Sequence, residues 1–199
     1  MKLIRAAVGI ACFVVLLLIV YVAYIKLFDV NVVFYSSIYA AIIATLIFGA
    51  IVFVTPLLKG FSAFEKLQSL AICLLLGYIF AISVPTVIDR SLSFYILEKL
   101  QQRGGGILED KMNYVFTNEY MEEDHLMQIR LTEQLQSGTI KIEDGCVKLT
   151  PWGNQLATFS SYFRQNLLPK HRLLMGEYTS TLTTPFAHSE APPPDYLCK

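Results

Sequence analysis

The chain has 199 residues and a formal net charge of zero, and 54% of its residues are hydrophobic. That hydrophobic content is too high for an ordinary soluble protein, and the excess lies in the first half of the chain. A net charge of zero removes the argument for a general nucleic-acid-binding protein, because such a protein needs an excess of cations.

Three apolar runs in the first 90 residues predict three transmembrane helices, at about 6–25, 31–58 and 67–88. Each run reaches the roughly 20 residues that a helix needs to cross the hydrocarbon core of a bilayer. None of them contains an internal Asp, Glu, Lys, Arg or His. Ion paths and proton relays use such residues near the midplane. The pattern therefore favours a membrane anchor over a transporter or pump.

Small and hydroxylated residues interrupt the second run, among them Ser36, Ser37 and Gly49, and Gly77 lies in the third. Such residues allow helices to approach closely in lipid. Pro85 lies near the end of the third run, where we expect it to bend or terminate the helix at the interface.

The orientation follows from the flanking charges. Four basic residues lie before the first run or between the second and the third: Lys2, Arg5, Lys59 and Lys66. The remaining connection holds Lys26, which Asp29 offsets. Because positive charge prefers the cytoplasmic side, the N-terminus is expected in the cytoplasm. Three spans then place the part after residue 90 on the other side of the membrane, which is the periplasm if this is a bacterial inner-membrane protein. Three basic residues after the third run argue for the opposite orientation: Arg90, Lys99 and Arg103.

A soluble domain is predicted over 91–175. Its first helix is expected to begin at a cap, Ser91 or Ser93, and to stop at the glycines 104–106. A second helix is expected over 109–121. A third is expected to begin at Asp124 and to stop at 137–138.

The segment after the third helix is more diagnostic. Residues 139–142 alternate, Asp144-Gly145 is typical of a tight turn, and 146–150 return, which predicts a β-hairpin. Pro151 suits the first turn of a closing helix, in which Trp152 begins an apolar stripe. The stretch LQSGTIKIEDGCVKLTPWGNQLA, with the helices before it, resembles a winged-helix domain covering about 91–168. The fold class expected is an α-helical membrane protein with three transmembrane helices and a small α+β winged-helix-like soluble domain.

A winged-helix resemblance implies DNA binding in many proteins, but the charges here oppose it. Residues 91–172 contain nine Lys/Arg and ten Asp/Glu, and a DNA-binding surface must neutralise several phosphates. Protein–protein interaction is therefore the favoured use of this domain, and no nucleic-acid partner is expected.

Chemistry-bearing residues are few. The acidic cluster Glu119, Glu122, Glu123, Asp124 and His125 has no metal-binding spacing, and helix-start electrostatics and capping explain it. The cysteines Cys12, Cys73, Cys146 and Cys198 form no CxxC pattern, so isolated thiols are expected. The sequence predicts no catalytic residue, no metal site, no cofactor and no small-molecule substrate.

Asp89 and Arg90 are the candidate functional residues, for contact with a lipid headgroup or a partner. At the interface Arg90 could bind a lipid phosphate while Asp89 orients it. The competing interpretation is an ordinary stop-charge and helix cap.

The last segment, 176–199, contains threonines and a run of prolines, and we expect it to be disordered. The function favoured is a non-enzymatic multi-pass accessory or scaffold protein that presents an interaction domain to a protein partner at the membrane, in bacterial envelope-glycan or lipid-linked assembly. Two alternatives are a membrane-tethered signalling or transcription regulator and an integral-membrane enzyme acting on a lipid headgroup.

Overall fold

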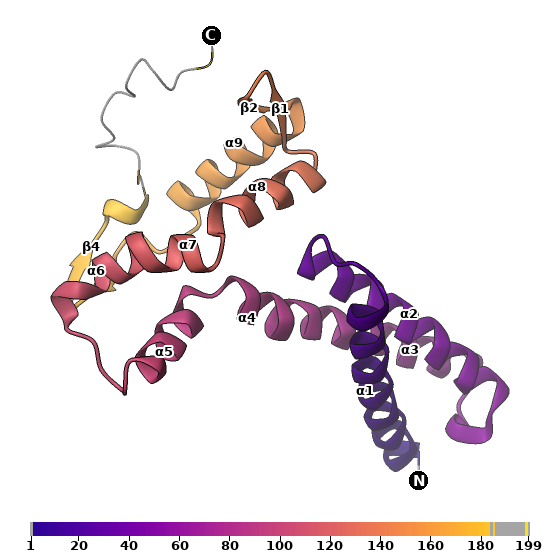
Figure 1. Ribbon diagram of the computed structural model, residues 1–199. Coiled ribbons are helices and arrows are strands. Elements are labelled where there is room, and N and C mark those ends of the chain that lie inside the picture. Colours follow the sequence, from indigo (N-terminus) through magenta and orange to yellow (C-terminus); the bar gives the residue numbers. More distant parts are fainter. Residues whose placement is uncertain (1, 184, 186–197, 199) are drawn as a thin grey trace. The chain divides into compact units, whose positions relative to one another are not determined.

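Three long helices occupy the first 90 residues of the computed structural model (Figure 1). They are α1 (Lys2–Leu27), α2 (Val33–Val54) and α3 (Ala63–Ala81), and α1 and α3 both pack against α2. The helix of α3 continues through η2 (Ile82–Thr86) and α4 (Val87–Arg90) to a total of 28 residues. All three are long and apolar enough to cross a membrane. Their ends differ from the expected 6–25, 31–58 and 67–88 by a few residues.

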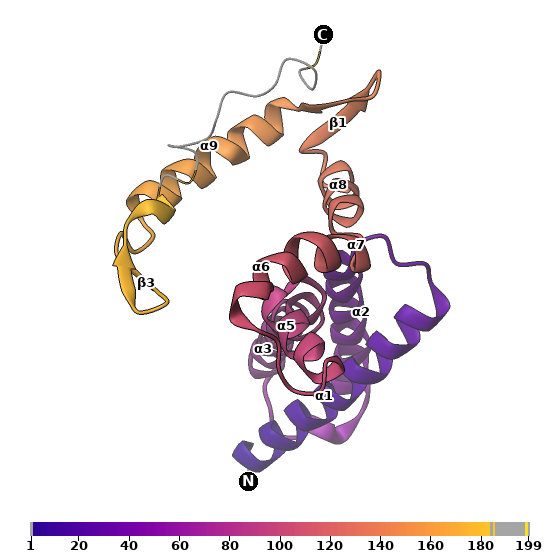
Figure 2. The same cartoon turned by 60° about the vertical axis from the view of Figure 1, so that its left-hand side comes forward.

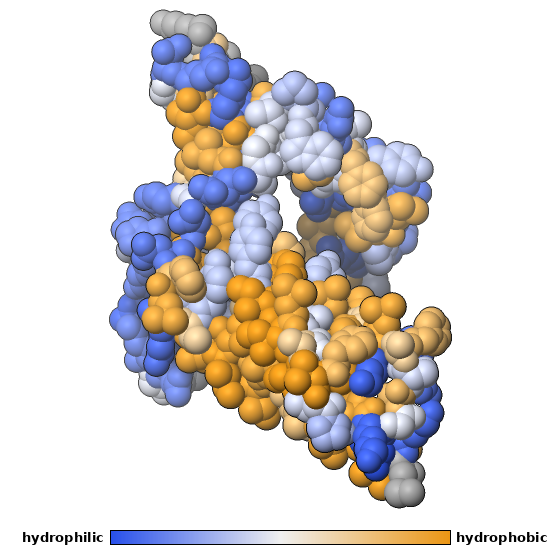
Figure 3. Space-filling view, turned by 90° about the vertical axis from the view of Figure 1, so that its right-hand side faces the viewer, coloured by the Kyte–Doolittle hydropathy of each residue, from blue (hydrophilic) through white to orange (hydrophobic). Residues whose placement is uncertain are grey.

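The core of these helices is built on α2. Its buried side chains recur every three or four residues along one face: Ser37, Ala41, Ala44, Phe48 and Val52. The rings of Phe13 and Phe48 meet edge to face, with their centroids 5.5 Å apart. The side chains that point outward from the three long helices are apolar as well, and Figure 3 shows a broad hydrophobic surface over these helices.

Close approach between helices depends on small residues. A Cβ added to Gly77 would lie 2.8 Å from the Cβ of Ala41, so only a residue without a side chain fits against α2 there. Dispersion contacts at such close approach stabilise helix pairs in lipid, where burial of apolar surface from water contributes nothing. The expectation that the small residues serve helix packing is thus met at this position.

Pro85 neither ends the helix nor leaves a carbonyl group unsatisfied. It lies inside the π-helical segment η2, and the helix continues to Arg90, so of the bend or termination expected here, termination does not occur. A proline cannot donate to the carbonyl four residues earlier, that of Ala81. The hydroxyl of Thr86 donates to this oxygen instead, at 2.7 Å. A neighbouring hydroxyl therefore replaces the missing N–H.

The structure describes every residue except 1, 184, 186–197 and 199. The chain divides into two compact units, Met1–Met127 and Gln128–Lys199.

The first unit continues after the apolar helices with α5 (Leu92–Gln102), for which Ser91 is the N-cap. Gly104 follows with a φ of 82°, and the amides of Gly104 and Gly105 donate to the carbonyls of Gln101 and Leu100. This pair of hydrogen bonds is a Schellman motif, so the glycines stop the helix as predicted.

A second helical stretch begins after the glycines. It comprises η3 (Glu109–Lys111), α6 (Met112–Tyr114), the π-helical η4 (Val115–Tyr120) and α7 (Met121–Glu123). His125 then adopts a φ of 45°, and α8 (Leu126–Gln136) begins at the next residue. The third helix therefore begins two residues after Asp124, where the sequence places its start.

The second unit contains the predicted hairpin. Strands β1 (Ile140–Glu143) and β2 (Cys146–Leu149) pair antiparallel, and Asp144 and Gly145 between them have φ values of 51° and 74°. Both signs match the type I′ turn expected of Asp-Gly. Figure 2 shows the hairpin leading into α9 (Pro151–Asn166), whose N-cap is Thr150. The order of elements is the expected one, and the winged-helix resemblance stays a prediction.

Two features of the second unit differ from expectation. Part of the segment 176–199, which was expected to be disordered, forms secondary structure: β4 (Glu177–Thr179) pairs with the preceding β3 (Arg172–Leu174), and η5 (Thr181–Thr183) follows. Most of the remaining tail lies outside the described residues. In addition, Cys146 and Cys198 form a disulfide with their Cα atoms 5.8 Å apart, so these two are not isolated thiols. Their separation of 52 residues concealed the pairing, because no short-range spacing marks it.

Candidate functional site

The densest group of interacting charges lies between α5 and the second helical stretch, on η4 and α7, and we call it the Lys99 cluster. It consists of Tyr95, Lys99, Arg103, Glu119 and Glu123. Residues 95, 99 and 103 are spaced by four and therefore share one face of α5 and its C-cap. Residues 119 and 123 have the same spacing in the second helical stretch, so the two rows can meet.

Lys99 is the centre of the cluster. Its side chain is only 3% exposed, and its Nζ lies 2.7 Å from a carboxylate oxygen of Glu119 and 2.7 and 2.8 Å from those of Glu123. A buried ammonium group is costly unless carboxylates pair with it, and here two do. The hydrogen bonds to Glu119 and Glu123 raise the pKa of Lys99, which therefore stays charged.

The carboxylates have further partners. Arg103 Nη2 lies 3.1 Å from Glu119, and the hydroxyl of Tyr95 donates to Glu123 at 2.8 Å. The hydrogen bond from Lys99 is the main cause that lowers the pKa of both glutamates. Burial is the main cause that raises the pKa of Tyr95. At neutral pH Lys99, Glu119 and Glu123 thus remain charged.

Aromatic rings close one side of the cluster. The ring of Tyr95 lies 4.5 Å from that of Tyr120, which stacks on Phe116 at 5.4 Å. This packing and the ion pairs hold α5 against the second helical stretch. A groove of about 280 Å³ runs beside Lys99, lined by Tyr95, Glu98, Lys99, Gln102, Glu123 and Asp124. Its acidic wall could accept an amine or guanidinium group, but it offers no nucleophile paired with a base.

The cluster explains only part of the acidic run. Glu119 and Glu123 are committed to ion pairs, so helix-start electrostatics do not account for them. Glu122 and Asp124 are exposed, and the amide of His125 donates to the Glu122 carbonyl oxygen. Among the described residues, no three His, Cys, Asp or Glu side chains gather as a metal site would require.

Asp89 and Arg90, the residues singled out from the sequence, lie at the end of α4. Asp89 is exposed and Arg90 is half-buried, and each interacts within the chain. Asp89 lies within electrostatic range of Tyr21 of α1, which is close to Ser37 of α2. Polar groups from three helices therefore meet at this end of the bundle, a convergence that the sequence did not reveal.

The opposite end of the bundle gathers basic residues. Lys2 Nζ lies 2.8 Å from a carboxylate oxygen of Glu65. Arg5 donates a hydrogen bond to the carbonyl oxygen of Lys59. Lys66 Nζ donates a hydrogen bond to the carbonyl oxygen of Val52, at 3.0 Å. Ser62 and Glu65 form a capping box at the start of α3. The four cations used to predict orientation thus lie together at one end.

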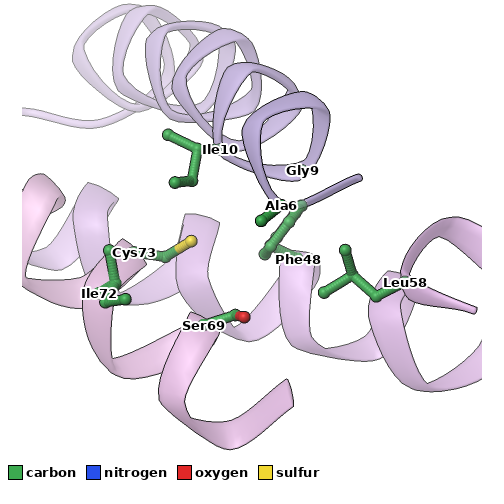
Figure 4. Close-up of a pocket in the computed structure, with 8 residues that line it drawn as sticks. All are labelled: Ala6, Gly9, Ile10, Phe48, Leu58, Ser69, Ile72 and Cys73. Atoms are coloured by element: carbon green, nitrogen blue, oxygen red, sulfur yellow. The ribbon is translucent and has the colours of Figure 1, made fainter. Parts of the chain in front are cut away.

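A small cavity lies between the apolar helices (Figure 4). Its volume is about 60 Å³, and its walls are Ala6, Gly9, Ile10, Phe48, Leu58, Ser69, Ile72 and Cys73. The Ser69 hydroxyl donates to the Glu65 carbonyl oxygen, so the lining offers little to a polar ligand. This cavity is a packing void and has no charged group to hold a substrate.

The architecture is that of three apolar helices, each able to cross a membrane, followed by helical segments and two hairpins. Comparison with protein-family models, curated proteins and solved structures finds no match to this chain.

Proposed function

We propose that this chain is an integral-membrane accessory protein that holds an interaction module at the membrane surface. The module is the part of the chain that follows Arg90. The observation that carries the proposal is the connection between the apolar helices and α5. The last apolar helix ends at Arg90 and α5 begins at Leu92, so Ser91 is the only residue between them. Because Ser91 is extended and caps α5, this connection is too short to be a flexible tether.

The Lys99 cluster supports the same function. It fixes α5 to the second helical stretch, so the orientation of α5 is passed on to that stretch. The charges serve rigidity, and the groove beside them carries no catalytic arrangement. A structural or regulatory role in a membrane complex fits this better than an enzymatic one, and bacterial envelope-glycan or lipid-linked assembly is the setting we propose.

We infer that the module lies outside the cytoplasm, in the periplasm of a bacterial inner-membrane protein. Two independent observations support this orientation. Four cations gather at the end of the bundle opposite Arg90, and positive charge prefers the cytoplasm. The disulfide between Cys146 and Cys198 suits an oxidising compartment.

The orientation is tested by acid-quenching cells and labelling the denatured chain with a maleimide of high mass. Of the four cysteines, Cys12 and Cys73 are free in the structure. We expect two adducts without reductant and four with it. Four adducts without reductant would place the module in a reducing compartment and contradict the proposal.

The accessory role is tested by purification in mild detergent from native membranes, followed by quantitative mass spectrometry. Lys99→Met removes the centre of the cluster, and Lys111→Met removes an exposed lysine paired only with neighbouring Asp110. We expect a partner enriched with wild-type protein to be lost with Lys99→Met and retained with Lys111→Met. Equal enrichment with both variants, both present at wild-type levels, would contradict the proposed role of the module.

A second candidate role rests on the position of Asp89 and Arg90 at the end of α4, where the last apolar helix ends. At an interface these residues could contact a lipid headgroup, with Arg90 binding its phosphate. Lipid that co-purifies with wild-type protein but not with Arg90→Gln would support this role. Equal lipid content would remove it.

A further inference from the structure

The closing helix α9 displays an apolar face that nothing in the described part of the second unit covers. Four of its residues recur at a spacing of four or three: Trp152, Leu156, Phe159 and Phe163. Phe159 is 62% exposed and Trp152 53% exposed. Large aromatic side chains at such exposure mark a surface that contacts another phase or molecule.

The hairpin after α9 has the same character. Figure 2 shows β3 following α9 along the chain. Leu173, Leu174 and Tyr178 are exposed on the hairpin, and Met175, 88% exposed, lies at its turn. The apolar surface thus extends beyond the helix to the tip of the hairpin.

Charge is distributed unevenly around this surface. Residues 109–144 contain nine Asp/Glu and three Lys/Arg. Residues 145–176, which include α9 and β3, contain no Asp or Glu and four Lys/Arg: Lys148, Arg164, Lys170 and Arg172. The apolar face of α9 is therefore accompanied only by positive charge, and the hairpin adds one exposed acidic residue, Glu177 of β4.

We propose that α9 and the β3–β4 hairpin lie on the surface of an anionic bilayer. Trp, Tyr and Phe prefer the interface between headgroups and acyl chains, and the excess of cations over Glu177 on these elements complements anionic lipid. A helix of 16 residues lying in the plane would extend about 24 Å along the membrane. This inference rests on the proposed membrane integration, because the apolar helices keep a bilayer at high effective concentration near α9.

Lipid fits this face better than a protein partner does. A protein interface that faced Arg164, Lys170 and Arg172 would need acidic groups placed opposite these cations. An anionic bilayer supplies diffuse negative charge over the whole surface, together with an apolar layer just beneath it. The uncharged polar residues of α9, such as Asn154, Gln155 and Ser161, can face the headgroups and water.

Trp152 is the only tryptophan of the chain and reports directly on this contact. Full-length protein is reconstituted into nanodiscs of phosphatidylcholine with phosphatidylglycerol, and elution with the discs shows membrane integration separately. We expect the Trp152 emission to be blue-shifted, shielded from acrylamide, and quenched by lipids brominated near the headgroup end of the acyl chain. Lipids brominated deep in the chain should quench less.

The double variant Lys170→Gln, Arg172→Gln tests the electrostatic part. Each cation near an anionic surface favours binding roughly fivefold, so removing two should lower the ratio of bound to free α9 roughly 25-fold. Bromolipid quenching should fall accordingly, whereas Lys111→Gln, outside the basic stretch, should leave it unchanged.

Two outcomes overturn the proposal while the protein still elutes with the discs. Emission open to acrylamide and unaffected by either bromolipid would place Trp152 in water. Blue-shifted emission without bromolipid quenching would place it against protein. Failure to elute with nanodiscs would contradict the membrane integration on which the inference rests.

Discussion

Gly153 of α9 lies directly against the backbone carbonyl of Thr139, so that a Cβ on residue 153 would overlap the carbonyl oxygen. Thr150 reinforces this contact, because its hydroxyl lies 2.7 Å from the Gly138 carbonyl oxygen and its amide donates to the Thr139 carbonyl oxygen. The base of the β1–β2 hairpin is therefore fixed to the first turn of α9 by backbone groups.

Substitution Gly153→Ala should destabilise this second unit. The added methyl group has no space, and overpacking of this kind costs about 1–3 kcal/mol. Urea unfolding of the full chain in detergent, followed by the fluorescence of neighbouring Trp152, measures the loss. Asn154→Ala, at an exposed position in the same turn, should shift the midpoint little. Equal midpoints for the two variants would contradict the contact.

Substitution Lys99→Met should loosen α5 from the second helical stretch. It leaves Glu119 and Glu123 near each other with Arg103 and Tyr95 as partners, and their pKa values should rise for lack of the ammonium group. Hydrogen exchange measured by mass spectrometry should show faster exchange in α5, while α9 remains unchanged. Lys111→Met should leave both segments unaffected. Unaltered exchange in α5 would show that aromatic packing alone holds it.

Acid should weaken the same packing. The folded-state pKa values of Glu119 and Glu123 lie below the ordinary 4.5, so their contribution to stability is complete above about 4.5 and is lost as the pH falls through the lowered values. Near-ultraviolet circular dichroism from Tyr95 and Tyr120 should therefore stay constant from neutral pH to about 5 and decline below it. In the double variant Glu119→Gln, Glu123→Gln, the circular dichroism signal should not decline in acid. The same decline in that variant would assign it to other groups.

Substitution Gly77→Leu should disrupt the pairing of α2 and α3. Any side chain at this position meets Ala41, and the helices must separate at a cost of about 1–3 kcal/mol or more. Thermal unfolding in detergent, followed by circular dichroism, should show a lower midpoint. Ala71→Leu, on the exposed side of α3, is the matched control and should behave as wild type.

Reduction of the Cys146–Cys198 disulfide should destabilise the second unit. Opening a loop of 52 residues costs about 2–4 kcal/mol, chiefly because the unfolded chain gains freedom. Cys146→Ser should have the effect of reduction and should make the unfolding midpoint independent of reductant. Cys12→Ser should retain the dependence. A wild-type midpoint that reductant does not change would argue against the pairing.

Local features were predictable from short stretches of sequence. The apolar runs, the Asp144-Gly145 turn, the Ser91 cap and the glycine stop at 104 each depend on residues within one or two turns. The effects of Pro85 and Asp124 on where helices end and begin were less predictable. The hydroxyl of Thr86 rescues the helix at the proline, and a left-handed His125 delays the start of α8 beyond Asp124.

The Lys99 cluster shows why the site itself was missed. The sequence did contain a signal for the cluster, because residues 95, 99 and 103 are spaced by four and so are residues 119 and 123. Matching two such rows requires knowledge of which helices pack together, and the intervening glycines do not specify that. The acidic run therefore looked like helix-start electrostatics until Lys99 lay between Glu119 and Glu123.

By itself the sequence determined that three helices are able to cross a membrane and that a hairpin precedes the closing helix, because hydropathy and turn chemistry act over neighbouring residues. Only the tertiary structure decided that Lys99 joins two carboxylates, that Cys146 meets Cys198, and that Gly77 meets Ala41. These pairs are brought together by packing between segments far apart in the chain, and their energy depends on distances that a linear pattern does not contain.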